Sequence, residues 1–498
     1  MPSSRTRVSD VRERVLSLET EYAVAFHSEG PSATPDPSRI VEAIGKPLTQ
    51  KWGIPASRFL INGSKFHHDV GHAEWSLPEC RSAREVAVYD KAADLALGSL
   101  LREAEAELAR DGYDGRLLVV KNNVDAHGHT YGCHENYAAE RQTAWLGTED
   151  QLRLTVRLLV PFLVTRQVFC GAGRVGLGPR LEEGGGFQIM QRADFVDETV
   201  SVDTTKRRAI VNLGREKEPL ATGNFRRLHL ILADANMSPW ATYLKLGTTG
   251  LVLSLLEDLC LGDIPHLENP VAALRTISRD PSCSVTVPLR DGRELTAVQI
   301  QRIYLDQAQR YLASHQQSDD EAQLVGRWAQ VLLVLEQDPK QLFGKVDWVT
   351  KKALMDAHLV RAGLQWSDLS DGPVPYDLLH LDIEYHNLSP DEGLFCRLPE
   401  ERWGGLISSE EIRQAQLSPP PYTRAKVRGQ AIALARRTVV HVEVDHWDRV
   451  TIGRWHISLG EPLEFFSPDL YALSREAPET NAAPRPVEET EDRQTYSR

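Results

Sequence analysis

Two glutamates one position apart, Glu19 and Glu21, lie in a segment with the residue pattern of a β-strand. Side chains alternate across a strand, so residues i and i+2 point to the same face of a sheet. Two carboxylates on one face suit a hard cation such as Mg²⁺, which prefers oxygen ligands and bridges to nucleotide phosphates. The same spacing is also typical of a solvated strand face. The metal-site interpretation therefore depends on further polar segments elsewhere in the chain.

Two such segments follow within the first 140 residues. Residues 66–76 place Asp69 and Glu74 five positions apart among aromatic residues that suit a strand. Residues 121–137 bring amide, carboxylate and imidazole side chains directly after the apolar run 117–120. Polar groups beside a buried strand are costly unless they have partners, which favours a lined cavity over a surface loop.

A third segment, residues 224–236, leads two arginines and a histidine into another apolar strand. Arginine makes paired hydrogen bonds to phosphate and carboxylate groups. Taken together, these segments resemble the Pup ligase/depupylase family, whose members are called PafA and Dop. The likeness runs from about residue 19 to about residue 468 without large gaps. It is carried by Glu19-Thr20-Glu21-Tyr22, Asn62-Gly63-Ser64, Asp69, Glu74, residues 121–125, 131–137 and 161–167, Arg226-Arg227-Leu228-His229, Thr423-Arg424-Ala425 and Arg428-Gly429.

The resemblance implies an α+β fold, a glutamine synthetase-like carboxylate-amine ligase fold. In such a fold a curved antiparallel sheet, backed by helices, holds ATP and Mg²⁺, and a small C-terminal domain completes the architecture. We expect a large catalytic domain over residues 14–402 and a small domain over 403–475. From residue 476 the composition turns to Pro, Glu, Thr and Arg, which predicts a disordered tail over 476–498.

The same resemblance assigns roles to individual side chains. Asp69 is implied as the catalytic carboxylate: the nucleophile or water-activating group of a depupylase, or the base that deprotonates lysine in a ligase. A structural hydrogen bond is an open alternative for each histidine, because imidazole is an unusual ligand for Mg²⁺. The implied metal ligands are Glu19, Glu21, Glu74, His134 and His229. The implied nucleotide-binding residues are Arg192, Arg227, His229, Arg424 and Arg428.

The family contains two opposite reactions. A Pup ligase phosphorylates the C-terminal glutamate of the small protein Pup and passes it to a substrate lysine, whereas a depupylase hydrolyses that isopeptide bond or deamidates a C-terminal glutamine of Pup. The five-residue step from Asp69 to Glu74 resembles the depupylase branch, as do residues 173–179 and 277–282. The short interval from Ser38 to Asn62 and the cysteine at position 133 resemble the ligase branch. We predict a Pup deamidase/depupylase, with a Pup–protein ligase as the alternative.

Two other classes of function stay open. One is a peptide ligase related to glutamate-cysteine ligase, which acts on no protein modifier. The other is a catalytically silent module that binds Pup. The extended match around Asp69 and Arg226-Arg227 argues against the first, and the presence of Asp69 together with the glutamates argues against the second.

Composition predicts an enzyme of the cytoplasm that binds neither nucleic acid nor a membrane. The net charge of −13 disfavours a phosphate backbone, and no apolar run is long enough to span a bilayer. Six scattered cysteines form no CxxC pair, which argues against a zinc site and a disulfide framework. Pup is itself acidic, so we expect a local basic groove, with candidates in residues 206–208, Arg226-Arg227, Arg166 and Arg192.

Residue patterns also predict the main elements. Strands are expected at 438–444 and 450–459. Residues 171–186, with seven glycines, predict a flexible loop and not a phosphate-binding P-loop, because no G-K-[ST] follows. Apolar spacing predicts helices over 84–110, 151–169, 239–261 and 297–360.

Overall fold

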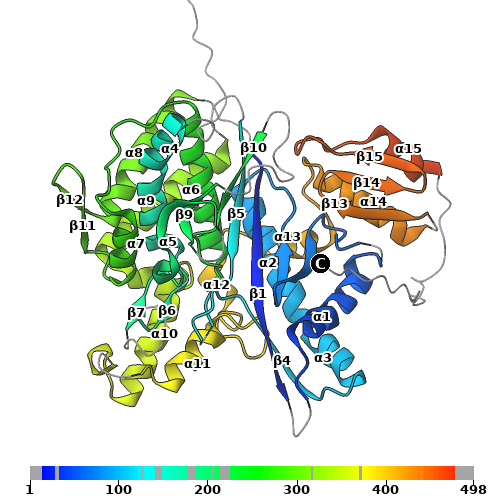
Figure 1. The fold of residues 1–498 in the computed structure, drawn as a ribbon, viewed down its shortest axis with the longest axis horizontal. Coiled ribbons are helices and arrows are strands. Elements are labelled where there is room, and N and C mark those ends of the chain that lie inside the picture. Colours follow the sequence, from blue (N-terminus) through cyan, green and yellow to red (C-terminus); the bar gives the residue numbers. More distant parts are fainter. Residues whose placement is uncertain are drawn as a thin grey trace, which may run out of the picture.

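A six-stranded antiparallel sheet forms the centre of the molecule (Figure 1). The computed structural model describes residues 14–28, 33–55, 57–125, 127–140, 149–177, 186–203, 207–213, 225–315, 318–369, 373–438 and 440–476. The strand order is β10-β5-β1-β3-β2, and β4 pairs with the second half of β1. The strands are β1 (Leu16–Ser28), β2 (Lys65–Asp69), β3 (His72–Ser76), β4 (Gly115–Val120), β5 (Cys133–Glu140) and β10 (Phe225–Leu230).

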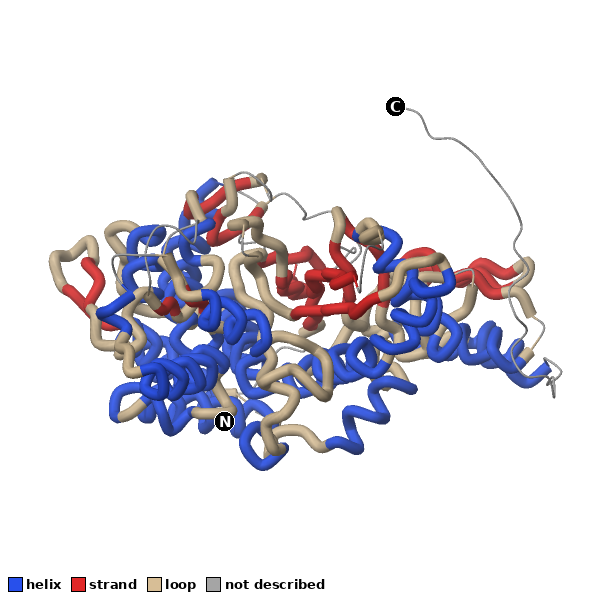
Figure 2. The backbone as a smooth tube through the Cα atoms, turned by 90° about the horizontal axis from the view of Figure 1, so that it is seen from below, coloured by secondary structure: helices blue, strands red, loops and turns tan. Residues whose placement is uncertain are grey.

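Strand β1 shows why the sheet has one covered and one open face. Leu18, Thr20 and Tyr22 are buried, whereas the intervening Glu19 and Glu21 are partly exposed. Alternation therefore sends the apolar residues toward the helices and the glutamates to the opposite face. Helices α2 (Ala83–Ser99) and α6 (Pro239–Glu257) pack on each other and contact β1 and β5, respectively. In Figure 2 most helices gather below the strands of the central sheet.

The remaining helices surround this layer, and the four predicted helical regions are confirmed. The first region divides at Leu100 into α2 and α3, and the last consists of three helices, α8 to α10. Residues 178–185 of the glycine-rich segment lie outside the described residues. The helices not yet given are α1 (Pro37–Trp52), α3 (Leu101–Arg110), α4 (Glu149–Thr165), α5 (Gln167–Cys170), α7 (Pro270–Ser278), α8 (Ala297–Ser314), α9 (Asp319–Gln337), α10 (Asp347–Ala362), α11 (Tyr376–Tyr385), α12 (Glu400–Trp403) and α13 (Ser409–Leu417).

Short strands form three further pairs. Strands β6 (Arg174–Val175) and β7 (Phe187–Gln188) are antiparallel, as are β11 (Thr286–Pro288) and β12 (Glu294–Thr296). Strands β8 (Glu198–Ser201) and β9 (Ala209–Asn212) are parallel. None of the helices in the described part of the chain is long and apolar enough to cross a membrane.

A small C-terminal unit has its own hydrophobic core. Strands β13 (Val442–His446), β14 (Arg449–Ile452) and β15 (Trp455–Ser458) form an antiparallel sheet that packs with α14 (Ala425–Arg437) and α15 (Pro468–Glu476), drawn in orange and red in Figure 1. The two predicted strand regions are thus confirmed, the second as a hairpin. Helix α13 lies within the range expected for the small domain, but it packs on α2, and its Ile412 and Ala415 belong to the large core. The α+β fold class agrees with expectation, and the division into domains at residue 403 stays a prediction. The predicted tail beyond residue 476 lies outside the described residues.

A buried ionic cluster joins the two units. Glu79, just after β3, accepts from Arg424 Nε at 2.7 Å and from Arg428 Nη1 at 3.1 Å, and all three side chains are almost fully buried. Arg428 also donates to the carbonyls of Gly63 at 3.2 Å and Trp447 at 2.8 Å. Gly63 has φ +80°, and a Cβ there would lie 2.9 Å from the Cβ of Ala425, so helix α14 depends on glycine at this position.

Glu79→Gln should destabilise the protein strongly, because it leaves two buried guanidinium groups without their counter-ion. Breaking a buried pair typically costs about 3 kcal/mol or more. The measurement is the midpoint of denaturant unfolding. Glu336→Gln, which removes the exposed Arg302–Glu336 pair on α8 and α9, is the matched control and should cost less than about 1 kcal/mol. Equal effects of the two substitutions would show that the cluster does not hold the units together.

Candidate functional site

The register of the sheet gathers the predicted site residues on its open face. Glu19 pairs with His134 on β5, and Glu21 pairs with Glu74 on β3. Asp69, the last residue of β2, lies next along the same edge, opposite His72. Side chains from strands far apart in sequence therefore converge, as the spacing of the motifs predicts.

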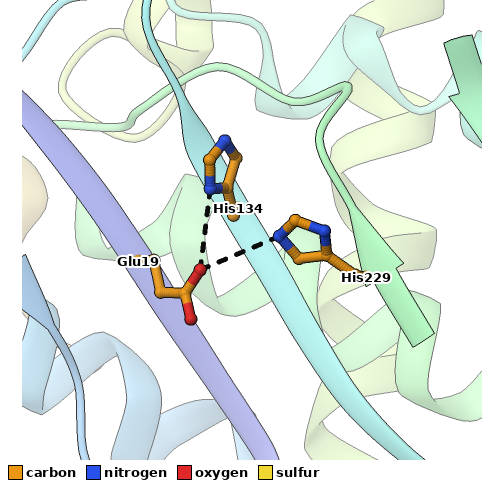
Figure 3. A group of neighbouring side chains, drawn as sticks. All are labelled: Glu19, His134 and His229. Atoms are coloured by element: carbon orange, nitrogen blue, oxygen red, sulfur yellow. Dashed lines mark ion pairs between the residues drawn. The ribbon is translucent and has the colours of Figure 1, made fainter. Parts of the chain in front are cut away.

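The first group consists of Glu19, His134 and His229, whose ligand atoms all lie within 4.8 Å of one another (Figure 3). Glu19 Oε2 lies 3.6 Å from His134 Nδ1 and 3.8 Å from His229 Nε2. Arg227, on β10 with His229, donates from Nη2 to Glu19 Oε1 at 3.0 Å and from Nε to Asn136 Oδ1 at 2.7 Å. Burial raises the pKa of Glu19, but the contacts with the histidines and the charge of Arg227 outweigh it and leave the pKa well below its usual value.

The second group consists of Glu21, Asp69 and Glu74, whose ligand oxygens also lie within 4.8 Å of one another. Burial, together with the charges of Glu19, Glu21 and Asp69, raises the pKa of Glu74 to about 8. His134 Nε2 lies 3.8 Å from Glu21 Oε1, so this imidazole stands between the two groups.

Both groups fit a divalent cation. Crowded carboxylate oxygens are the donor set that Mg²⁺ takes. Among the residues that the structure describes, neither ring nitrogen of the buried His229 has a hydrogen-bond partner. Burial lowers the pKa of His229 to about 4, so its imidazole is neutral at physiological pH and has a free lone pair. The donor chemistry therefore agrees with the five predicted metal ligands, although direct ligation by each of them stays a prediction.

Arg192 lies in the segment between β7 and β8. Its side chain is buried, donates to the carbonyl of Ile231, and carries a pKa lowered to about 10, chiefly by burial and by the charge of Arg208. Glu21 partly offsets this effect, which places Arg192 within electrostatic range of the second group. A role for Arg192 toward an anionic ligand stays a prediction.

Arg424 and Arg428 belong to the buried cluster around Glu79. Both arginines donate to Glu79 and to backbone carbonyls, which are structural contacts, and nucleotide binding by them stays a prediction. Arg166, a candidate for an open basic groove, is instead buried against Glu135, and that expectation is wrong. Arg166 lies between α4 and α5 in the core, so an arginine there needs an internal carboxylate as partner.

The pattern of β2 contains two site residues that the sequence analysis missed. His67 pairs in register with Glu74, and its Nε2 lies 3.8 Å from Glu74 Oε1. Lys65 lies two positions before it on the same face, and Glu74, Glu19 and Asp69 all act electrostatically on its ammonium. The spacing of positions 65, 67 and 69 indicates these residues, because side chains two positions apart on a strand share a face, as Glu19 and Glu21 do.

Folding of the metal-free protein should depend on pH through Glu74. Its carboxyl has a pKa of about 8 in the folded protein against about 4.3 in an unfolded chain. The bound proton on Glu74 therefore makes its whole contribution to the free energy of unfolding below about pH 4. This contribution is lost as the pH rises through 8.

Glu74→Gln stays neutral, so its stability advantage over the wild type should grow by about 2 to 3 kcal/mol between pH 6 and pH 9. Denaturant unfolding in the presence of a chelator measures this difference. An advantage that does not change with pH would contradict the electrostatic account of this group.

Comparisons with known proteins agree with this geometry. Residues 14–451 match the family model described as Pup-ligase protein. The chain is 38% identical to the Pup–protein ligase of Acidimicrobium ferrooxidans over 87% of this chain and 91% of that protein. It is 37% identical to the depupylase of Acidothermus cellulolyticus over 88% of this chain and 90% of that protein.

Two solved structures are similar over most of their length. The complex between Pup and its ligase PafA superposes with a TM-score of 0.80 at 32% identity, covering 94% of this chain and 93% of that chain. PafA in complex with ADP superposes with a TM-score of 0.74 at 32% identity, covering 91% and 96%.

Proposed function

This chain belongs to the Pup-ligase family, and we propose that within it the chain is a Pup deamidase/depupylase. It would hydrolyse the isopeptide bond between the C-terminal glutamate of Pup and a substrate lysine, and deamidate a C-terminal glutamine of Pup. ATP and Mg²⁺ would be bound on the open face of the sheet, which fits the ADP complex of a related structure. The single observation that carries the proposal is the position of Asp69 beside Glu21 and Glu74.

Asp69 suits the reacting step by its position. It ends β2 at the rim of the carboxylate row and is only partly buried, so a substrate carbonyl can approach it from solvent. A carboxylate so placed either attacks the carbonyl carbon or takes a proton from a water molecule that attacks it. The tetrahedral oxyanion then needs a nearby positive charge, for which Arg192 or the bound cation is the candidate.

The two carboxylate groups divide the binding task. Glu19, with His134 and His229, and Glu21 with Glu74 would hold the cation. When bound, Mg²⁺ neutralises phosphate charge and orients the nucleotide. Lys65 and Arg227 stand at either side of the row and would pair with phosphate oxygens.

The hydrolase is preferred over the ligase because of the hairpin that carries Asp69. Strands β2 and β3 join through the two residues Val70 and Gly71, which gives the five-residue step from Asp69 to Glu74 that resembles the depupylase branch. The ligase is the second candidate, because the short interval from Ser38 to Asn62 resembles the ligase branch. Helix α1 occupies most of this interval. Identity does not discriminate, because a ligase and a depupylase match the chain at 38% and 37%.

Two parallel assays separate the candidates. In the first, the purified protein, ATP and Mg²⁺ are incubated with a Pup-conjugated protein; in the second, with Pup ending in glutamate and an acceptor protein. Release of free Pup supports the hydrolase, and formation of new conjugates supports the ligase. Formation of conjugates without any release would overturn the proposal.

Asp69→Asn should lower the rate of whichever reaction appears by about a hundredfold or more, because the amide neither attacks nor accepts a proton. Nucleotide binding should change by less than about twofold, since Glu19 and its histidines are untouched. Turnover kinetics and titration with a fluorescent ATP analogue measure the two effects. Asp391→Asn, an exposed aspartate paired with Arg102, is the matched control. Residual turnover near the wild-type rate would remove Asp69 from the reaction.

A further inference from the structure

The turn that follows Asp69 has an unusual residue in an unusual conformation. Val70 and Gly71 connect β2 to β3, with φ of +42° and +92°. The Gly71 amide donates to His68 Nε2 at 3.1 Å, which closes the turn. The Val70 side chain is 86% exposed.

Neither backbone preference nor internal packing accounts for valine here. A two-residue hairpin turn with positive φ at both positions favours Asn-Gly, and a β-branched residue with positive φ is a genuine outlier. Such strain is held where the surroundings or the function require it. An apolar side chain that is 86% exposed gains almost nothing from burial within the chain. Contact with a ligand would supply the missing burial.

We propose that Val70 packs against the aliphatic arm of the lysine in the target protein and so favours protein conjugates over other Pup substrates. This inference rests on the proposed function. Consecutive Cα atoms lie about 3.8 Å apart, so Val70 directly adjoins Asp69, where the scissile bond must sit. The four methylene groups of a lysine arm run outward from that bond. An exposed apolar group at the rim is the surface they meet.

The test compares two substrates that differ in this arm. A Pup–protein conjugate has the lysyl methylenes, whereas Pup ending in glutamine loses only ammonia. Val70→Asn should lower kcat/KM for the conjugate by about tenfold, the low end of the range for losing one small apolar contact. It should leave glutamine deamidation within about twofold of wild type. Asparagine also suits the turn, so the variant should unfold one or two degrees higher.

Two further variants sharpen the comparison. Leu259→Asn is the matched control, because Leu259 is also exposed and has φ +55°, but it follows α6 and lies outside the carboxylate groups. It should relieve the same kind of strain and leave both activities unchanged. Val70→Ile keeps an apolar side chain and should retain conjugate cleavage.

Three outcomes would overturn the inference. They are conjugate cleavage by Val70→Asn within twofold of wild type, an equal loss of both activities, and an equal loss of cleavage in Leu259→Asn. If the wild type releases neither Pup nor ammonia, the proposed hydrolase function fails, and the comparison moves to ligation. There Val70→Asn should raise KM for the acceptor protein about tenfold without changing Pup-dependent ATP hydrolysis, and an unchanged KM would overturn it.

Discussion

Four carboxylates crowded on one face of a sheet are the constraint on which the rest of this structure depends. Glu19, Glu21, Asp69 and Glu74 lie on three adjacent strands, where like charges repel and burial adds a desolvation cost. The carboxylates respond to this cost in different ways. Glu19 keeps its charge through Arg227 and two imidazoles, whereas Glu74 is pushed toward its neutral form. The half of the row around Asp69 is therefore the half that most requires a cation.

Such crowding is stable only on a rigid support, and the opposite face of β1 supplies it. Tyr22, next to Glu21, donates to Asp94 Oδ1 at 3.1 Å. Lys121, at the end of β4, donates to Asp90 and Asp94 at 2.7 and 3.1 Å, and Thr242 on α6 donates to Asp90 at 3.0 Å. The sheet and its two central helices are thus tied together by buried, mutually satisfied charges. Removing one member would leave another unpaired, which is the costly arrangement for buried ions.

The row of carboxylates could be predicted from the sequence because strand alternation is a local rule. Positions 19 and 21 share a face whatever the tertiary fold, and the resemblance brought the distant strands that carry Glu74, His134 and His229. It did not reach Lys65 and His67, although the same rule applies to them, because a lysine and a histidine carry a weaker metal signal than paired carboxylates. Arg166 was misread because its partner, Glu135, lies 31 positions away and only packing brings them together.

The partners of Arg424 and Arg428 could not be predicted from the sequence, because a guanidinium suits a phosphate and a buried carboxylate equally well. Here both pair with Glu79, and this pairing links the hairpin that bears Asp69 to the small unit. Glu79 lies three residues beyond β3, and Gly63, whose carbonyl Arg428 also binds, lies two residues before β2. The two ends of the hairpin that bears Asp69 and Glu74 are therefore anchored to helix α14. A shift of that helix must move the hairpin relative to Glu19 and Glu21 on β1, so the C-terminal unit helps to set the geometry of the site without contributing a carboxylate to it.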